Sequence, residues 1–144
     1  MLRLTRQCDY GIVLMTHFAG DVNETVQNAR DLARCVNLPL PTVSKILKAL
    51  ARAGLLVSHR GVKGGYSLAR APGEITVDEI IEALEGPIAL TECLDGAADE
   101  CGIEFSCPVR TNWKRINDAV RDALRGIRLS EMATTVTFQP PVEK

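Results

Sequence analysis

The chain has 144 residues, of which 46% are apolar and 24% charged, a composition typical of a globular domain with a core of its own. Only 4% of the residues are aromatic, so we expect a core of aliphatic side chains, which favours helices over a sheet sandwich. The sequence contains neither an apolar run long enough to span a membrane nor a signal peptide. We therefore expect a cytoplasmic protein with no membrane partner.

The net charge of −1 conceals a division between the two halves of the chain. Residues 1–70 contain ten Lys and Arg against four Asp and Glu, whereas residues 71–144 contain seven against fourteen. A basic half of this kind indicates a polyanionic partner such as nucleic acid, although scattered solvated charges could give the same count.

Three helices are predicted in the first third of the chain. Residues 8–19 form a buried pattern that stops at Gly20, and a short helix follows over 27–36. Asn37-Leu38-Pro39 ends the second helix, because a proline ring blocks continuation. A third helix starts near Pro41 and ends at Gly54, with apolar residues on one face and basic residues on another. Two short helices joined by a tight turn are typical of a helix-turn-helix, although ordinary helical hairpins are commoner.

A glycine-rich basic hairpin follows the third helix. Strand-like runs at 55–58 and 66–68 flank the segment His59-Arg60-Gly61-Val62-Lys63-Gly64-Gly65. Glycines allow a sharp turn and a close approach of the backbone to phosphate. A basic hairpin directly after a helix-turn-helix is a wing, and the combination indicates DNA binding more strongly than either part.

The predicted DNA contacts come from these two elements. We expect the start of the third helix to contact base edges or phosphates through Thr42, Ser44 and Lys45. We expect the wing to contact phosphate or the minor groove through Arg60 and Lys63.

Two further helices are predicted in the acidic half. Thr76 and Glu79 form a capping-box pattern at the start of a fourth helix, which Gly86-Pro87 stops. After Pro108, apolar residues recur at alternating spacings of three and four as far as Ile127. Such a heptad-like stripe predicts a long helix that forms a dimer seam, the alternative being packing against its own domain. The residues from Met132 onward are expected to form a loosely ordered tail.

The predicted fold is therefore mainly α with a small β wing. It comprises a winged helix-turn-helix domain over 1–86, a cysteine loop over 87–108, a dimerisation helix over 109–131 and a flexible tail over 132–144.

Three of the five cysteines fall within one polar segment, as Cys93-x7-Cys101-x5-Cys107. In a reducing compartment such a group indicates metal binding or redox chemistry rather than disulfides. Thiolates select zinc, copper(I) or an iron–sulfur cluster, and the count alone does not separate zinc from a cluster. Cys35 lies beside apolar residues of the second helix and is interpreted as a core thiol, whereas Cys8 is ambiguous.

Taken in order, these motifs resemble the IscR/NsrR-type winged-helix repressors, which sense iron–sulfur cluster status, nitric oxide or redox state in bacteria. The resemblance runs from Arg3 to about Glu131. It rests on Arg3-Leu4-Thr5, Leu55-Leu56-Val57, the wing from Arg60 to Leu68, the three-cysteine loop, the helix with Trp113, and the closing Leu129-Ser130-Glu131. Within this family the chain is most similar to the regulators of the SUF cluster-assembly operon.

The resemblance implies that Cys93, Cys101 and Cys107 ligate a 2Fe–2S or 4Fe–4S cluster, together with a fourth ligand that is not a cysteine. In some members that ligand is a histidine, but the matching position here is Arg110, which cannot ligate. In others it is an acidic residue donated by the partner subunit, and the matching residue is Asp9. We expect Asp9 to be the fourth ligand, with Cys8 as the alternative.

The function implied is that of a homodimeric repressor on a pseudo-palindromic, double-stranded DNA operator. Its DNA affinity would depend on the cluster, and its targets would be cluster-assembly genes or a redox or nitric oxide response. Two alternatives remain: a winged-helix regulator with a structural zinc, and a small cluster-carrier or electron-transfer protein. No nucleophile–base pair, phosphate-binding glycine motif or pair of carboxylates is recognisable, so we expect no enzyme.

Overall fold

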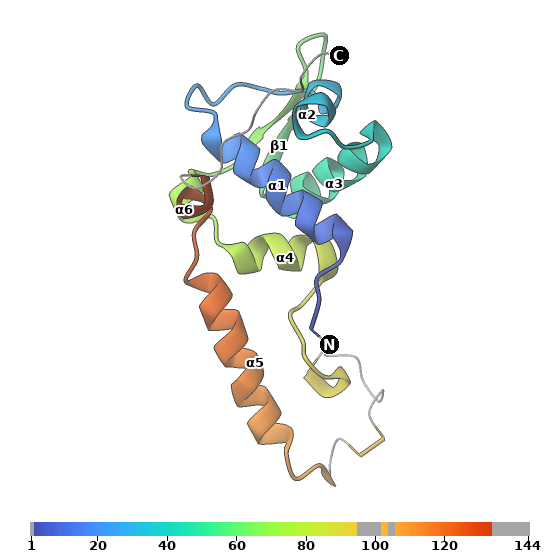
Figure 1. Ribbon diagram of the computed structural model, residues 1–144, viewed down its shortest axis with the longest axis vertical. Helices are drawn as coiled ribbons and strands as arrows, with labels where there is room; N and C mark the ends of the chain where they lie inside the picture. The colour runs from blue at the N-terminus through green and yellow to red at the C-terminus, as the bar shows by residue number, and fades with distance from the viewer. Residues whose placement is uncertain (1, 95–101, 104–105, 134–144) are drawn as a thin grey trace.

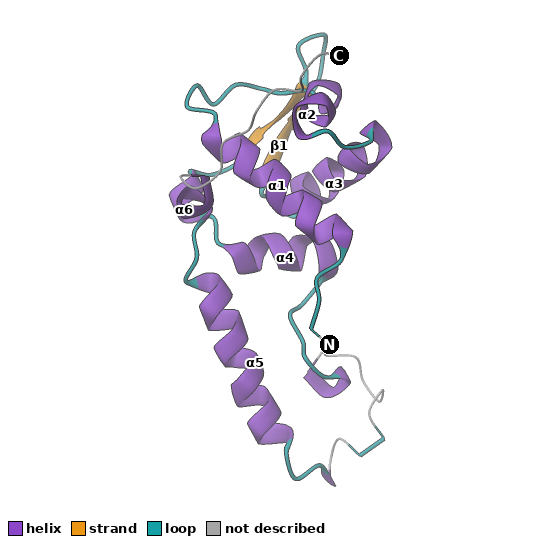
Figure 2. Ribbon diagram, viewed as in Figure 1, coloured by secondary structure: helices purple, strands orange, loops and turns teal. Residues whose placement is uncertain are grey.

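The computed structural model describes residues 2–94, 102–103 and 106–133. Most of this part of the chain is helical, and its only sheet has two strands (Figures 1 and 2). The elements are α1 (Arg6–Gly20), α2 (Ala29–Val36), α3 (Leu40–Arg52), β1 (Leu56–His59), β2 (Gly65–Leu68), η1 (Pro72–Glu74), α4 (Val77–Glu85), η2 (Glu92–Leu94), α5 (Arg110–Arg125) and α6 (Leu129–Ala133). The predicted fold class is confirmed.

The helices α1 to α4, the two strands and α6 form a compact unit, which we call the head. Helix α1 lies at its centre and contacts α3, α4 and α6. Its fully buried Leu14 and Met15 belong to one mainly aliphatic cluster with residues of α2, α3 and the strands. This is the aliphatic core that the low aromatic content predicted. Burying each of these side chains contributes roughly 1.5–3 kcal/mol, which stabilises the head well beyond the intrinsic propensity of its short helices.

Local capping signals set where the helices begin. Thr5 caps α1 by accepting a hydrogen bond from the Cys8 N–H (3.2 Å), and Asn28 caps α2 through the Asp31 N–H (2.8 Å). At α4, the Glu79 carboxylate accepts from the Thr76 N–H (3.0 Å), so the predicted capping box is present. These bonds satisfy N–H groups that a helix start leaves without a backbone partner.

A short left-handed turn joins α2 to α3. Asn37 adopts φ 55°, and its N–H reaches back to the Ala33 and Arg34 carbonyls, which ends α2. The helix-turn-helix is followed by the antiparallel pair β1–β2, in the register Leu56↔Leu68 to His59↔Gly65. The order of helix, turn, helix and hairpin is the one that the sequence predicted.

Helix α5 starts at a distance from the head and runs back to it, where the chain continues into α6 (Figure 1). The helix ends at Arg125, and α6 starts at Leu129, whose side chain is fully buried in the core of the head. The Leu129 N–H donates to the Ile75 carbonyl (2.9 Å). The prediction of one helix over 109–131 is therefore wrong at its C-terminal end, because burying Leu129 in the head requires the chain to turn.

None of the helices described is both long and apolar enough to cross a membrane. The predicted tail lies outside the described residues from position 134 onward.

Candidate nucleic-acid interface and metal-binding loop

Helix α3 presents a polar face on the outside of the head. Its apolar residues are fully buried, including Val43 and Ile46. At its first turns, Thr42 and Ser44 are half-buried and Lys45 is exposed. Because α3 is amphipathic, packing its apolar face on α1 leaves Lys45 on the solvent side of the helix, with Thr42 and Ser44 at the borders of the buried face.

The wing projects beyond α3 and carries exposed Arg60 and Lys63. Its tip depends on two glycines. Gly61 adopts φ 107°, which side chains rarely allow, and an added Cβ on Gly64 would lie 2.5 Å from the His59 carbonyl oxygen. The glycines that suggested a sharp turn in the sequence are therefore required by the backbone itself.

A pair of backbone hydrogen bonds fixes the wing to the segment that precedes α2. The Gln27 N–H donates to the Tyr66 carbonyl (2.9 Å), and the Tyr66 N–H donates to the Gln27 carbonyl (2.8 Å). The Gln27 side chain lies 2.9 Å from His17 Nε2 on α1. The sequence analysis did not identify Gln27, because no pattern marks a lone bridge between distant segments.

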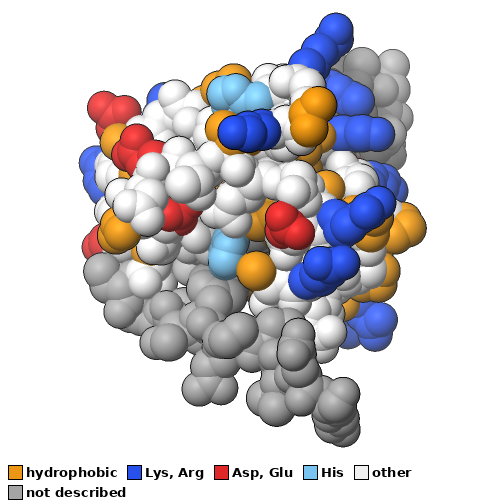
Figure 3. Space-filling view, turned by 90° about the horizontal axis from the view of Figure 1, so that it is seen from above, with side chains coloured by type: hydrophobic (Ala, Val, Ile, Leu, Met, Phe, Trp, Pro, Cys, Tyr) orange, Lys and Arg blue, Asp and Glu red, His pale blue; other side chains and the backbone are white. Residues whose placement is uncertain are grey.

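Basic side chains gather on the end of the molecule that carries the wing. In Figure 3, Lys and Arg side chains lie mainly along the right of this face and most Asp and Glu side chains lie to the left. The exposed basic residues of α3 and the wing are Lys45, Lys48, Arg52, Arg60 and Lys63. A surface of this sign attracts the phosphates of nucleic acid.

The cysteine loop is described at its two ends. Cys93 lies in η2 and Cys107 lies just before α5, and both are half-buried and free of disulfides. The Cys93 Sγ is 3.1 Å from the Thr91 hydroxyl. The third predicted ligand, Cys101, lies outside the described residues. Within the described ranges, no three His, Cys, Asp or Glu side chains gather as a metal would require.

Of the other two cysteines, the sequence predicted Cys35 to be a core thiol and left Cys8 ambiguous, but the structure buries Cys8 and exposes Cys35. Cys8 is fully buried against Val77 and Ile81, and desolvation, with the nearby Glu85 and Asp9 charges, raises its pKa to about 11. A buried neutral thiol is a core residue and not an available ligand. Cys35 is exposed, so its interpretation as a core thiol is wrong. Asp9 is exposed on the first turn of α1.

Ion pairs join α5 to α4 in the head. Arg125 Nε is 3.1 Å from Asp78 Oδ2, and Arg121 Nη2 is 3.2 Å from Glu82 Oε1. The Asp78 side chain is only 4% exposed. Burial alone would raise its pKa, but hydrogen bonds from Thr76 and Arg125 outweigh burial and lower it.

Another face of α5, together with Val109 just before the helix, exposes apolar residues of the predicted stripe. Val109 is 44% exposed, Trp113 38% and Ile116 46%. Val120 is half-buried in a groove of about 610 Å³ between residues 2–4, residues 85–92 and α5. The stripe thus stays largely uncovered by the described part of its own chain.

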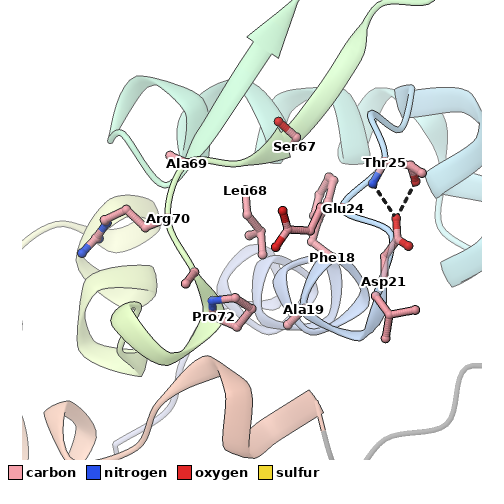
Figure 4. A pocket seen from close by; sticks show the side chains of 12 residues that line it. Phe18, Ala19, Asp21, Glu24, Thr25, Ser67, Leu68, Ala69, Arg70 and Pro72 are labelled. Carbon is pink, nitrogen blue, oxygen red and sulfur yellow. Dashed lines mark hydrogen bonds between the residues drawn. The ribbon is translucent and has the colours of Figure 1, made fainter.

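A second cavity, of about 340 Å³, lies between the end of α1 and the segment from β2 to η1 (Figure 4). Beside it, the Asp21 carboxylate accepts hydrogen bonds from the Thr25 N–H (3.0 Å) and hydroxyl (2.5 Å). The Thr25 hydroxyl bond is the largest influence on the pKa of Asp21, which is lowered although burial opposes the shift. These bonds order the loop before the helix-turn-helix, and we assign the cavity no ligand.

Comparison with known proteins identifies the family. Residues 4–135 match the Rrf2 family, which is described as iron-dependent transcriptional regulators. The chain belongs to the Rrf2 family. This confirms the resemblance to IscR-type winged-helix regulators and the expectation that the protein is not an enzyme.

Two of the similar proteins are named as HTH-type transcriptional regulators. The chain is 32% identical to the regulator CymR of Bacillus subtilis, over 92% of this chain and 91% of the relative. It is 28% identical to the regulator IscR of Aliivibrio salmonicida, over 91% and 77%.

Solved structures of two such regulators are also similar to this chain. The CymR global cysteine regulator of B. subtilis has a TM-score of 0.74 at 32% identity, covering 95% of this chain and 100% of that one. IscR of T. potens has a TM-score of 0.70 at 27% identity, covering 93% and 88%. The protein is therefore a transcriptional regulator with a DNA-binding winged helix.

Proposed function

We propose that this Rrf2-family protein is a homodimeric, cytoplasmic transcriptional repressor whose DNA affinity is controlled by an iron–sulfur cluster on Cys93, Cys101 and Cys107. The observation that carries the proposal is the position of the cysteine loop. It joins α4 of the DNA-binding head to α5, a helix with an uncovered apolar stripe. The proposed targets are genes for cluster assembly or for a redox or nitric oxide response.

The DNA contacts follow from the outward faces of α3 and the wing. We propose that Thr42, Ser44 and Lys45 meet base edges or phosphates in the major groove, where a recognition helix reads sequence with its N-terminal residues. Arg60 and Lys63 then reach the flanking phosphates or the minor groove.

A homodimer accounts for the apolar side of α5. Trp113 and Ile116 are both more than one-third exposed, and burying them against a second copy would remove apolar surface from water. A two-fold dimer presents two recognition helices to a pseudo-palindromic operator, with half-sites about 34–36 Å apart or a multiple of that spacing.

The donor set suits a cluster. Cys93 and Cys107 are soft thiol ligands, both half-buried, and the Thr91 hydroxyl can donate a hydrogen bond to the Cys93 sulfur. Cys101, outside the described residues, would supply the third thiolate. Asp9 is exposed and carries a carboxylate, which supports it as the fourth ligand, donated across the dimer. The burial of Cys8 disfavours the alternative.

The cluster would influence DNA binding through α5. When bound, an iron–sulfur cluster would supply an iron site that a carboxylate holds less tightly than a thiolate does, which would leave that iron open to nitric oxide, oxygen or ligand exchange. Cys107 lies three residues before α5, and Arg121 and Arg125 hold α5 to the head. A change in the loop would therefore shift α5 and the spacing of the two recognition helices, which is a coupling between two sites.

An anaerobic absorption spectrum with iron and sulfide counts tests the cluster. Cys93→Ala, Cys101→Ala and Cys107→Ala should abolish the visible absorbance, whereas Cys35→Ala, an exposed thiol on α2, should leave it unchanged. A colourless protein that contains zinc, or full absorbance in all three variants, would contradict the proposal. Selecting an operator from random DNA and comparing affinity with and without the cluster tests its control of binding.

The salt dependence of DNA binding tests the wing. Arg60→Ala should weaken binding and reduce the slope of log K against log salt by about 0.9 per subunit, because one phosphate contact is lost. Lys114→Gln is the matched control, because Lys114 is an exposed cation on α5, outside the wing, that forms an ion pair with Asp118. An unchanged slope for Arg60→Ala would contradict the assigned contact.

A further inference from the structure

A buried asparagine on α5 pairs with the chain segment that leads into the cysteine loop. The Asn117 side chain is 5% exposed, although most of its helix is solvent-facing. Its Nδ2 donates to the Ile88 carbonyl oxygen (3.0 Å), and its Oδ1 accepts from the Leu90 N–H (3.0 Å). One side chain thus supplies a donor and an acceptor to two alternate residues, as a neighbouring strand would.

Asn117 and its two partners lie on opposite sides of the three cysteines in sequence. Leu90 precedes Cys93 by three residues, whereas Asn117 follows Cys107 by ten, on the helix that leaves the loop. The pair of hydrogen bonds therefore closes the base of the loop. The next polar contact beyond Leu90 is between Thr91 and the Cys93 sulfur (3.1 Å), so the closure reaches the first cysteine almost directly.

Asn117 is also the first of three residues on one side of α5 that form polar contacts with preceding parts of the chain. Arg121 and Arg125 follow at intervals of four residues and pair with Glu82 and Asp78 of α4. Those two pairs hold the helix to the head. Asn117 is different, because both of its side-chain hydrogen bonds go to the backbone between α4 and Cys93. Loss of Asn117 would loosen the loop base while both ion pairs remain.

We propose that Asn117 is a positioning residue for the metal site: it fixes the separation of the chain at Cys93 and Cys107 and thereby slows release of the bound group. This inference rests on the proposed function, because it assumes that these cysteines bind metal. The physical reason is preorganisation, since ligands held in place before binding lose less freedom on binding. Groups that hydrogen-bond directly to metal ligands commonly change metal affinity by about 10–100-fold when removed, and that range sets the scale expected for Asn117, which acts through the backbone near Cys93.

The test compares Asn117→Leu and Asn117→Asp with the control Asn112→Leu in the full-length protein. Leu has a similar volume but makes neither hydrogen bond, and Asp keeps only the acceptor. Asn112 is exposed on the same helix, so its loss should change nothing. Two rates are measured: exchange of the Leu90 amide hydrogen, and bleaching of the cluster absorbance by an iron chelator. Both should rise in the Asn117 variants, the second by about 10–100-fold.

A third measurement separates this inference from the cluster proposal. The metal-free proteins are titrated with Co²⁺, whose thiolate complexes absorb visible light, and Asn117→Leu should bind about 10–100-fold more weakly than the wild type. If the wild type contains no iron or sulfide but still binds Co²⁺ more tightly than Asn117→Leu does, the cluster proposal is wrong and the positioning role of Asn117 stands. Unchanged Co²⁺ affinity and unchanged bleaching in a folded Asn117→Leu or Asn117→Asp protein would overturn the positioning role. Circular dichroism of the metal-free proteins shows which variant is folded.

Discussion

Replacing Gly65 with Ala should detach the wing from the rest of the head. An added Cβ would lie 2.5 Å from the Gln27 carbonyl carbon and 2.8 Å from the Asn28 nitrogen, where ordinary contacts begin at 3.4 Å. These neighbours are backbone atoms and cannot rotate away. The strand must therefore move, and both hydrogen bonds between Gln27 and Tyr66 (2.9 and 2.8 Å) are lost or stretched.

The magnitude follows from the two hydrogen bonds. Each is worth about 0.5–1.5 kcal/mol net, so Gly65→Ala should lower the free energy of unfolding by about 1–3 kcal/mol. For a chain of this size the melting temperature should fall by about 3–10 °C. Displacement of the wing should also remove charge-assisted contacts to phosphate worth about 1.5–3 kcal/mol, which predicts at least a tenfold loss of DNA affinity.

Thermal unfolding followed by circular dichroism, and titration of a labelled operator, measure the two effects. Gly20→Ala is the matched control: Gly20 ends α1, and an added Cβ there meets nothing within 4 Å. It should leave both quantities unchanged or slightly raise the melting temperature. If Gly65→Ala melts and binds DNA as Gly20→Ala does, the contact between Gln27 and the wing does not position the wing.

Four further predictions follow from buried and exposed side chains. Leu129→Ala should lower the free energy of unfolding in urea by about 2–5 kcal/mol, because Leu129 is fully buried, and a loss below about 1 kcal/mol would place α6 outside the core. Hydrogen bonds outweigh burial and lower the pKa of Asp78, so the stability it contributes is present above its unfolded pKa and is lost as pH falls through the folded value. Asp78→Asn should therefore lose less stability than the wild type on acidification, and parallel curves would refute this. Trp113→Glu should convert the dimer to a monomer in sedimentation, since it would bury a carboxylate at the seam, and an unaltered dimer would contradict the seam. Cys35 should react with iodoacetamide in the folded protein, whereas Cys8, buried and with a pKa of about 11, should react only on unfolding; equal rates would contradict their assigned environments.

Local chemistry explains why much of the fold was predictable. Thr76 and Glu79 lie three residues apart, and a capping box needs nothing beyond that spacing. Gly20 ends α1, and the glycines of the wing are required by a turn that the hairpin forms by itself. The basic face of α3 follows from helical periodicity, because packing one face of an amphipathic helix exposes the other.

Tertiary contacts decided the features that the sequence left open or predicted wrongly. Cys35 lies next to apolar Val36 in sequence but is exposed, whereas Cys8 lies between polar Gln7 and Asp9 but is buried against α4. Helix α5 ends at Arg125 because Leu129 is buried against distant parts of the head, which periodicity within the helix cannot indicate. Asn117 looks like any polar residue on the solvent side of the helix until the backbone of Ile88 and Leu90 is placed beside it. The sequence by itself thus determined the order and type of the elements, because short-range hydrogen bonds and side-chain periodicity govern them. Only the tertiary structure decided which thiol is buried, where α5 stops and what closes the cysteine loop, because those depend on contacts between residues far apart in the chain.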